Sequence, residues 1–112
     1  IAKTKGKLSR IMFVKIHESN DRNIVAVCDE YLIGKEISEG DLNLNITERF
    51  YKGDKIPEEK IIEIMKNSLN LNIVGKKAIK LALDNNIIEK DSIIEINKIP
   101  HAQVYQLEWK NT

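Results

Sequence analysis

The order of hydrophobic and polar positions along the chain predicts strands at both ends and helices between them. Residues 11–16 and 24–28 are mostly apolar and flank a polar cluster at residues 19–23, which is the pattern of a β-hairpin. At residues 42–47, Leu and Ile alternate with Asn and Thr, which indicates a strand with one solvated face. Residues 29–40 carry two glycines, and we expect a short helical turn or an irregular crossover there.

The middle of the chain has the pattern of two helices. Pro57 begins the first helix, because the missing N–H of proline is tolerated at a helix start, and Glu58 and Glu59 suit the positive end of the helix dipole. Asn72 is the expected N-cap of the second helix, which should end near Asn85. Apolar residues of the second helix follow helical spacing: Val74, Ala78, Leu81 and Ala82.

The last third of the chain returns to strand patterns. Residues 93–96 are rich in Ile, and residues 102–108 alternate between apolar and polar side chains. Pro100 can lie only at a strand start or at an edge. The order strands–helix–helix–strands predicts an α+β fold, with a mainly antiparallel sheet and the helix pair packed on one face.

Length and composition favour one globular domain. The 112 residues suit a single core, and 42% hydrophobic with 31% charged residues is an ordinary globular balance. We therefore expect one α/β domain at residues 12–112, preceded by a basic extension at residues 1–11. Residues 1–17 contain basic side chains and no acidic ones: Lys3, Lys5, Lys7, Arg10 and Lys15. A basic arm is typical of nucleic-acid tethering, while the alternative is a non-native or disordered segment ahead of Met12.

Other features indicate a cytoplasmic protein. The longest apolar run, residues 24–28, is far shorter than the ~20 residues of a membrane span, so we expect no membrane partner. The basic start lacks the apolar stretch of a secretory signal. Cys28 is the one cysteine, which excludes an internal disulfide and suits a reducing compartment.

Two clusters of cations are candidate phosphate contacts. The net charge of +1 gives no overall basic field, and Lys outnumbers Arg by 15 to 3, which favours phosphate attraction over base readout. Arg49 and Lys52 lie among aromatic residues, as in surfaces that stack on bases, although a strand end with a surface salt bridge fits as well. Gly75, Lys76, Lys77 and Lys80 open the second helix. A glycine there lets backbone amides approach an anion; a solvated lysine face is the alternative.

The sequence contains no recognisable catalytic set. Cys28 is followed by Asp29 and Glu30, whose charges oppose a reactive thiolate, and it closes an apolar strand, where a thiol is inert. His17 and His101 match no short metal-ligand motif. We therefore predict no catalytic residues, no metal site and no cofactor.

Four segments together resemble one known family. They are residues 27–35, 46–53, 72–78 and 99–105, and their order and spacing are similar to those of the archaeal family named domain of unknown function 424. The resemblance extends from Met12 to Leu107. It implies an archaeal cytoplasmic protein of compact α/β fold, and it supplies no activity or site residues.

Three hypotheses about function follow. The first is a non-enzymatic protein of the translation system that binds ribosomal or other structured RNA, and ribosomal proteins with it, through its lysine-rich surface. The second is a protein–protein adaptor with exposed aromatic anchors: Phe50, Tyr51, Tyr105 and Trp109. The third is a small enzyme or ligand-binding protein with a pocket near Cys28, Asp29, Glu30 and His101. The sequence favours the first and leaves the oligomeric state open.

Overall fold

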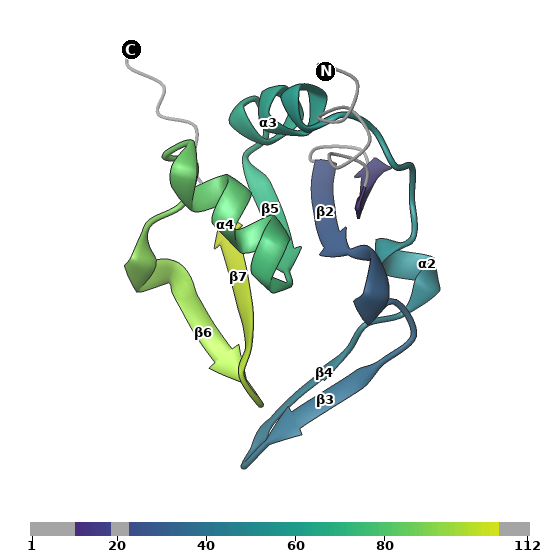
Figure 1. The fold of residues 1–112 in the computed structure, drawn as a ribbon, viewed down its shortest axis with the longest axis vertical. Coiled ribbons are helices and arrows are strands. Elements are labelled where there is room, and N and C mark those ends of the chain that lie inside the picture. Colours follow the sequence, from purple (N-terminus) through teal and green to yellow (C-terminus); the bar gives the residue numbers. More distant parts are fainter. Residues whose placement is uncertain (1–10, 19–22, 106–112) are drawn as a thin grey trace, which may run out of the picture.

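A computed structural model describes residues 11–18 and 23–105 of the chain (Figure 1). The strands are β1 (Met12–Glu18), β2 (Asn23–Asp29), β3 (Glu36–Glu39), β4 (Leu42–Asn45), β5 (Asn70–Val74), β6 (Ile93–Ile96) and β7 (Ile99–Tyr105). The helices are α2 (Glu48–Tyr51), α3 (Glu58–Lys66) and α4 (Lys76–Asp84), with short 3-10 turns η1 (Glu30–Leu32) and η2 (Lys90–Ser92). Of helices α2 to α4, none is long and apolar enough to cross a membrane.

The strands form one five-stranded sheet and one hairpin. The sheet order is β1-β2-β5-β7-β6, and β3 pairs with β4 alone. Among the described strands, β2 and β5 run parallel and the other pairs are antiparallel. The chain is therefore an α+β protein with a mainly antiparallel sheet, as the sequence predicts, and the expected β1–β2 hairpin is confirmed.

Helices α3 and α4 cover one face of the five-stranded sheet. Ile61 of α3 and Ala78 and Ala82 of α4 are fully buried in one core with Val27 and Ile73 of the sheet. Figure 1 shows α3 across the upper end of β5 and α4 next to β5. Fully burying a side chain of the size of Ile contributes about 1.5–3 kcal/mol, so this core holds the helix pair on the sheet.

The other face is covered in part by α2, η1 and the β3–β4 hairpin. Leu32, Ile46 and Tyr51 from these elements form a second core against Cys28 and Val74 of the sheet. Figure 1 shows the hairpin extending beyond the end of the sheet and α2 beside β2.

The structure corrects the expected start of the second helix. Residues 70–74 form β5, which lies between the two helices in sequence and at the centre of the sheet, so the assignment of Asn72 as a helix N-cap is wrong. The N-cap of α4 is Gly75, and Asn85 is the C-cap, as expected. Leu71 and Ile73 are buried while Asn72 is half-buried, so the five residues are a strand with an Asn on the second face.

A short helix replaces the strand end expected near residue 50. The side chain of Thr47 accepts a hydrogen bond from the Phe50 N–H at 3.1 Å and caps the one-turn helix α2. The chain then pairs with the edge of β1, where Val14 and Asp54 exchange backbone hydrogen bonds of 2.9 Å. A Cβ on Gly53 would overlap the Val14 carbonyl, so glycine permits this close approach.

Two sequence-based expectations lie largely outside the described residues. The first is the basic extension at residues 1–11, of which the structure describes Ile11 alone. The second is the role of Trp109 as an exposed anchor, because Trp109 lies outside the described residues.

Candidate nucleic-acid interface

A buried carboxylate joins the end of β2 to the start of α4. Asp29 is fully buried; its Oδ2 accepts the Lys77 N–H at 3.0 Å and its Oδ1 accepts the Ala78 N–H at 2.8 Å. The first amides of a helix have no partner within the helix, and a carboxylate there also interacts favourably with the helix dipole. Asp29 therefore acts as the N-cap side chain of α4, although it precedes Lys77 by 48 residues. We call this arrangement the Asp29 cap.

Gly75 is required by the Asp29 cap. Its φ of +114° and ψ of +151° are a backbone conformation available essentially to glycine, and a Cβ there would overlap the carboxyl group of Asp29. Gly75 is buried, and its N–H donates to the Pro100 carbonyl at 3.0 Å. The sequence suggested that backbone amides at this helix start bind an anion. In the structure two of them, those of Lys77 and Ala78, donate to Asp29. We therefore expect any phosphate contact at this end of α4 to come mainly from the lysine side chains.

Burial sets the protonation behaviour of Asp29. It raises the pKa of the carboxyl group above 3.8, while the amides of Lys77 and Ala78 and the charge of Lys77 act in the opposite direction. The positive groups at the start of α4 therefore offset part of the desolvation of this carboxylate.

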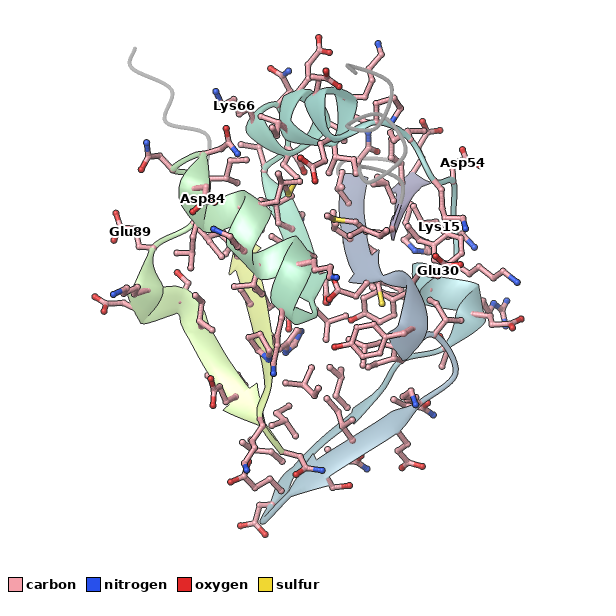
Figure 2. The ribbon with its side chains drawn as sticks, viewed as in Figure 1. Lys15, Glu30, Asp54, Lys66, Asp84 and Glu89 are labelled. Carbon is pink, nitrogen blue, oxygen red and sulfur yellow. The ribbon has the colours of Figure 1, made fainter. Side chains whose placement is uncertain are left out.

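The predicted cations of α4 are exposed beside this cap. The side chains of Lys76, Lys77 and Lys80 lie on the surface, and Lys80 forms an ion pair of 2.8 Å with Asp84 one turn later. Figure 2 labels Asp84 at the far end of α4. Among the described residues, no carboxylate lies within 4.0 Å of the ammonium of Lys76 or Lys77. These two lysines are available to a phosphate.

Tyr31 adds an aromatic ring that the sequence analysis did not single out. It lies in η1, two residues after Asp29, and 53% of it is exposed. Partial burial and the charges of Asp29 and Cys28 raise the pKa of its hydroxyl. We define Lys76, Lys77 and Lys80 as the α4 cluster. The sequence gives no signal for the exposure of Tyr31, because Leu32 and Ile33 follow it directly in an apolar run that indicates burial.

The other predicted cations lie on the opposite face of the sheet. Arg49 and Lys52 are exposed on α2, which packs in the second core through Tyr51. The Lys15 ammonium donates to the Arg49 carbonyl at 2.6 Å, and Lys52 lies 4.0 Å from the Glu48 carboxylate. The structure therefore divides the predicted phosphate contacts into two separate sets.

The side chains of the expected pocket near Cys28 do not converge. The Cys28 thiol donates to the Asp29 carbonyl at 3.2 Å, and burial followed by the charge of Asp29 raises its pKa to about 12. Val74 of β5 lies between Cys28 of β2 and His101 of β7 in the sheet register. Glu30 pairs with Lys55 at 2.9 Å. Cys28 is thus a buried neutral thiol without a base.

A polar network on the second sheet face was missed by the sequence analysis. Tyr51 OH donates to Asn72 Oδ1 at 2.6 Å, and His101 Nε2 lies 3.1 Å from the same oxygen. Asn72 Oδ1 can only accept, so Nε2 carries the ring proton. Burial lowers the pKa of His101, which keeps the ring neutral at physiological pH. We call these three residues the Asn72 network.

The aromatic residues expected as adaptor anchors differ in exposure. Tyr51 is buried, and Phe50 is half-buried and stacks on His17 with ring centroids 4.4 Å apart. Tyr105 is 50% exposed. These residues therefore do not form one continuous set of anchors.

The fold and this surface define a small α+β protein with exposed cations at a fixed helix start. The model of the family "Protein of unknown function (DUF424)" matches residues 17–107, and the chain belongs to this family. A solved structure described as an uncharacterized conserved protein from Methanopyrus kandleri is similar, with a TM-score of 0.78 and 25% sequence identity. The match covers 90% of this chain and 96% of that chain. A search of curated proteins found no match.

Removing the Asp29 carboxylate should destabilise the protein. Asp29→Ala leaves two helix amides without acceptors, one buried and one partly buried, and we expect the free energy of unfolding in urea to fall by about 2–4 kcal/mol. Asp41→Ala, at the exposed tip of the β3–β4 hairpin, is the control and should change it by less than about 0.5 kcal/mol. Equal effects of the two substitutions would contradict the cap.

Acidification should weaken the fold through His101. Its pKa in the folded protein lies below the usual 6.5, so the unfolded chain binds more protons as the pH falls below this value, and stability decreases there. Urea unfolding between about pH 5 and pH 7.5 should show this slope, and His101→Gln should remove it. His17→Gln is the control and should retain the slope, because His101 remains. A slope unchanged in His101→Gln would show that another group is responsible.

Proposed function

We propose that this protein is a non-enzymatic RNA-binding protein of archaeal translation, and that the α4 cluster contacts the RNA. The observation that supports this proposal is the position of Lys76 and Lys77. Both are exposed, have no carboxylate within ion-pair distance among the described residues, and follow a backbone held by the Asp29 cap. Fixed cations lose less conformational freedom on binding a phosphate than cations on a loose segment.

Tyr31, two residues after the carboxylate that caps α4, offers a second kind of contact with RNA. An exposed aromatic ring can stack on an unpaired base while lysine ammonium groups contact the backbone. Such stacking is worth about 1–3 kcal/mol per base, so one ring would add appreciably to phosphate attraction.

Structured RNA, including ribosomal RNA, is the partner class that we infer. The net charge of +1 offers no long-range attraction, so binding must rely on local contacts of defined geometry. Ribosomal proteins would be secondary contacts, and the cytoplasm is the compartment that fits this role. The similar protein from an archaeon supports an archaeal source.

Charge reversal in the α4 cluster should weaken RNA binding. For Lys76→Glu with Lys77→Glu, we expect at least about tenfold lower affinity for a structured RNA at about 0.1 M salt, and a salt dependence less steep by about 1.5 in log–log slope. The measurement is fluorescence anisotropy across a salt series with labelled RNA.

The matched control makes the same change in net charge on α3. Lys60→Glu with Lys66→Glu alters exposed side chains of that helix, and Figure 2 labels Lys66 near its end. This pair should retain the slope of the unaltered protein. If both double variants weaken binding alike, net charge alone controls the affinity and the assignment to α4 is wrong.

Association with ribosomes is tested separately in cell extract. We expect the protein to sediment with ribosomal particles in a sucrose gradient at low salt and to be released at high salt, because phosphate contacts are screened. Migration as a free small protein at both salt concentrations would contradict stable ribosome association while leaving direct RNA binding to the anisotropy experiment.

A further inference from the structure

The open part of the second sheet face carries a donor and an acceptor held in fixed positions. Asn72 Oδ1 is occupied by the Tyr51 hydroxyl and His101 Nε2. This leaves the Asn72 amide NH₂ as a donor and His101 Nδ1 as an acceptor. Within the described residues, neither of these two nitrogen atoms has a hydrogen-bond partner. Every fully buried side-chain nitrogen or oxygen among the described residues does have a partner. Both atoms therefore reach solvent, although His101 is only 7% exposed.

Neighbouring residues hold this pair in place and leave part of the surrounding sheet surface exposed. Asn72 and His101 lie on the adjacent central strands β5 and β7, and Tyr51 fixes the amide from α2. Gln103, directly opposite Asn72 in the register, is exposed, and Ile94, opposite His101 on β6, is 47% exposed. Helix α4 packs against the other face of these strands, so it does not cover this area.

Cations lie on the same face. Arg49 and Lys52 are exposed on α2, the helix that supplies Tyr51, and Lys15 on β1 contacts the Arg49 carbonyl. An exposed part of the sheet with a donor, an acceptor and an aliphatic side chain, on the same face as cations, matches the parts of a nucleotide: a base with a hydrogen-bonding edge and a negatively charged backbone.

We propose that the Asn72 network and its open surroundings bind an unpaired base of single-stranded RNA, with Asn72 Nδ2 donating to the base edge and His101 Nδ1 accepting from it. This proposal rests on the proposed RNA-binding function and adds to it a second contact, on the face opposite the α4 cluster. Asn72 and His101 touch the base, and Tyr51 acts as a positioning residue. Arg49 and Lys52 contact the backbone.

Asn72→Asp tests the donor with little change in shape. The aspartate keeps an oxygen for Tyr51 and His101 but replaces the NH₂ donor with a second acceptor. Asn45→Asp is the matched control, because it makes the same isosteric amide-to-carboxylate change at an exposed strand position on β4, outside the proposed site. Urea unfolding of both variants checks that they fold.

The probes are oligouridylate and oligoadenylate about ten nucleotides long, and an abasic strand of the same length. We expect the unaltered protein to bind at least one base-bearing strand about tenfold more tightly than the abasic strand. Asn72→Asp should lose this preference and Asn45→Asp should retain it. Because the first comparison uses the unaltered protein, it stands even if Asn72→Asp fails to fold.

The remaining outcomes separate this inference from the proposed function. Equal binding of base-bearing and abasic strands would overturn it, as would equal loss in Asn72→Asp and Asn45→Asp, since charge alone would then explain the effect. Failure to bind any short strand, with binding of structured RNA retained through Lys76 and Lys77, would overturn the inference and leave the proposed function intact. Failure to bind any RNA would overturn both.

Discussion

The cap that Asp29 forms on α4 is the interaction on which the arrangement of the sheet and helices depends. It ties the last residue of β2 to the first turn of α4, immediately after the parallel pairing of β2 with β5 ends at Cys28 and Val74. A fully buried carboxylate is costly without partners, so it strongly favours the one arrangement that supplies two amides. Gly75 is the residue that lets those amides approach. The positions of Lys76 and Lys77 follow from this arrangement, because Lys76 follows Gly75 directly and the Lys77 N–H donates to Asp29.

The polar side chains on the two faces of the sheet differ in burial and in hydrogen bonding. On the α4 face the carboxylate of Asp29 is enclosed and all its hydrogen bonds are internal. On the other face Asn72 is half-buried, and its oxygen is satisfied while its amide nitrogen reaches solvent. The first arrangement is fully buried, so a ligand in solvent does not reach it, and its role is structural. The second retains a donor and an acceptor, which is why a binding role is inferred there and not at Asp29.

Local sequence patterns predicted the secondary-structure elements whose conformation depends on neighbouring residues. They failed where pairing with residues far away in sequence sets the conformation. The β1–β2 hairpin and the start of α3 at Pro57 follow from short-range signals, and both were expected. Asn72 and the residues after it were assigned to a helix, because an Asn before apolar residues resembles an N-cap. Their strand conformation is set by pairing with β2 and β7, which lie far away in sequence.

In the candidate site, too, local sequence patterns predict some features and not others. The exposure of Lys76, Lys77 and Lys80 follows from helical spacing and was predictable. The bonds from Asp29 to α4 and from Asn72 to Tyr51 and His101 join residues 21 to 49 positions apart, which no local pattern reveals. Thr47 followed by Glu48 is a short capping signal that could have indicated α2.

The separation of the cations on two faces limits the kind of RNA that can use both. Charges are screened within about 10 Å at 0.1 M salt, and the five-stranded sheet lies between the α4 cluster and Arg49 with Lys52. The two sets therefore act almost independently on any short strand. Two weak sites on one rigid domain gain affinity together only for a ligand that reaches both. An RNA that folds around the domain meets this condition, and an isolated short strand does not, so under the proposed function the two sets of cations fit a structured RNA better than a short strand.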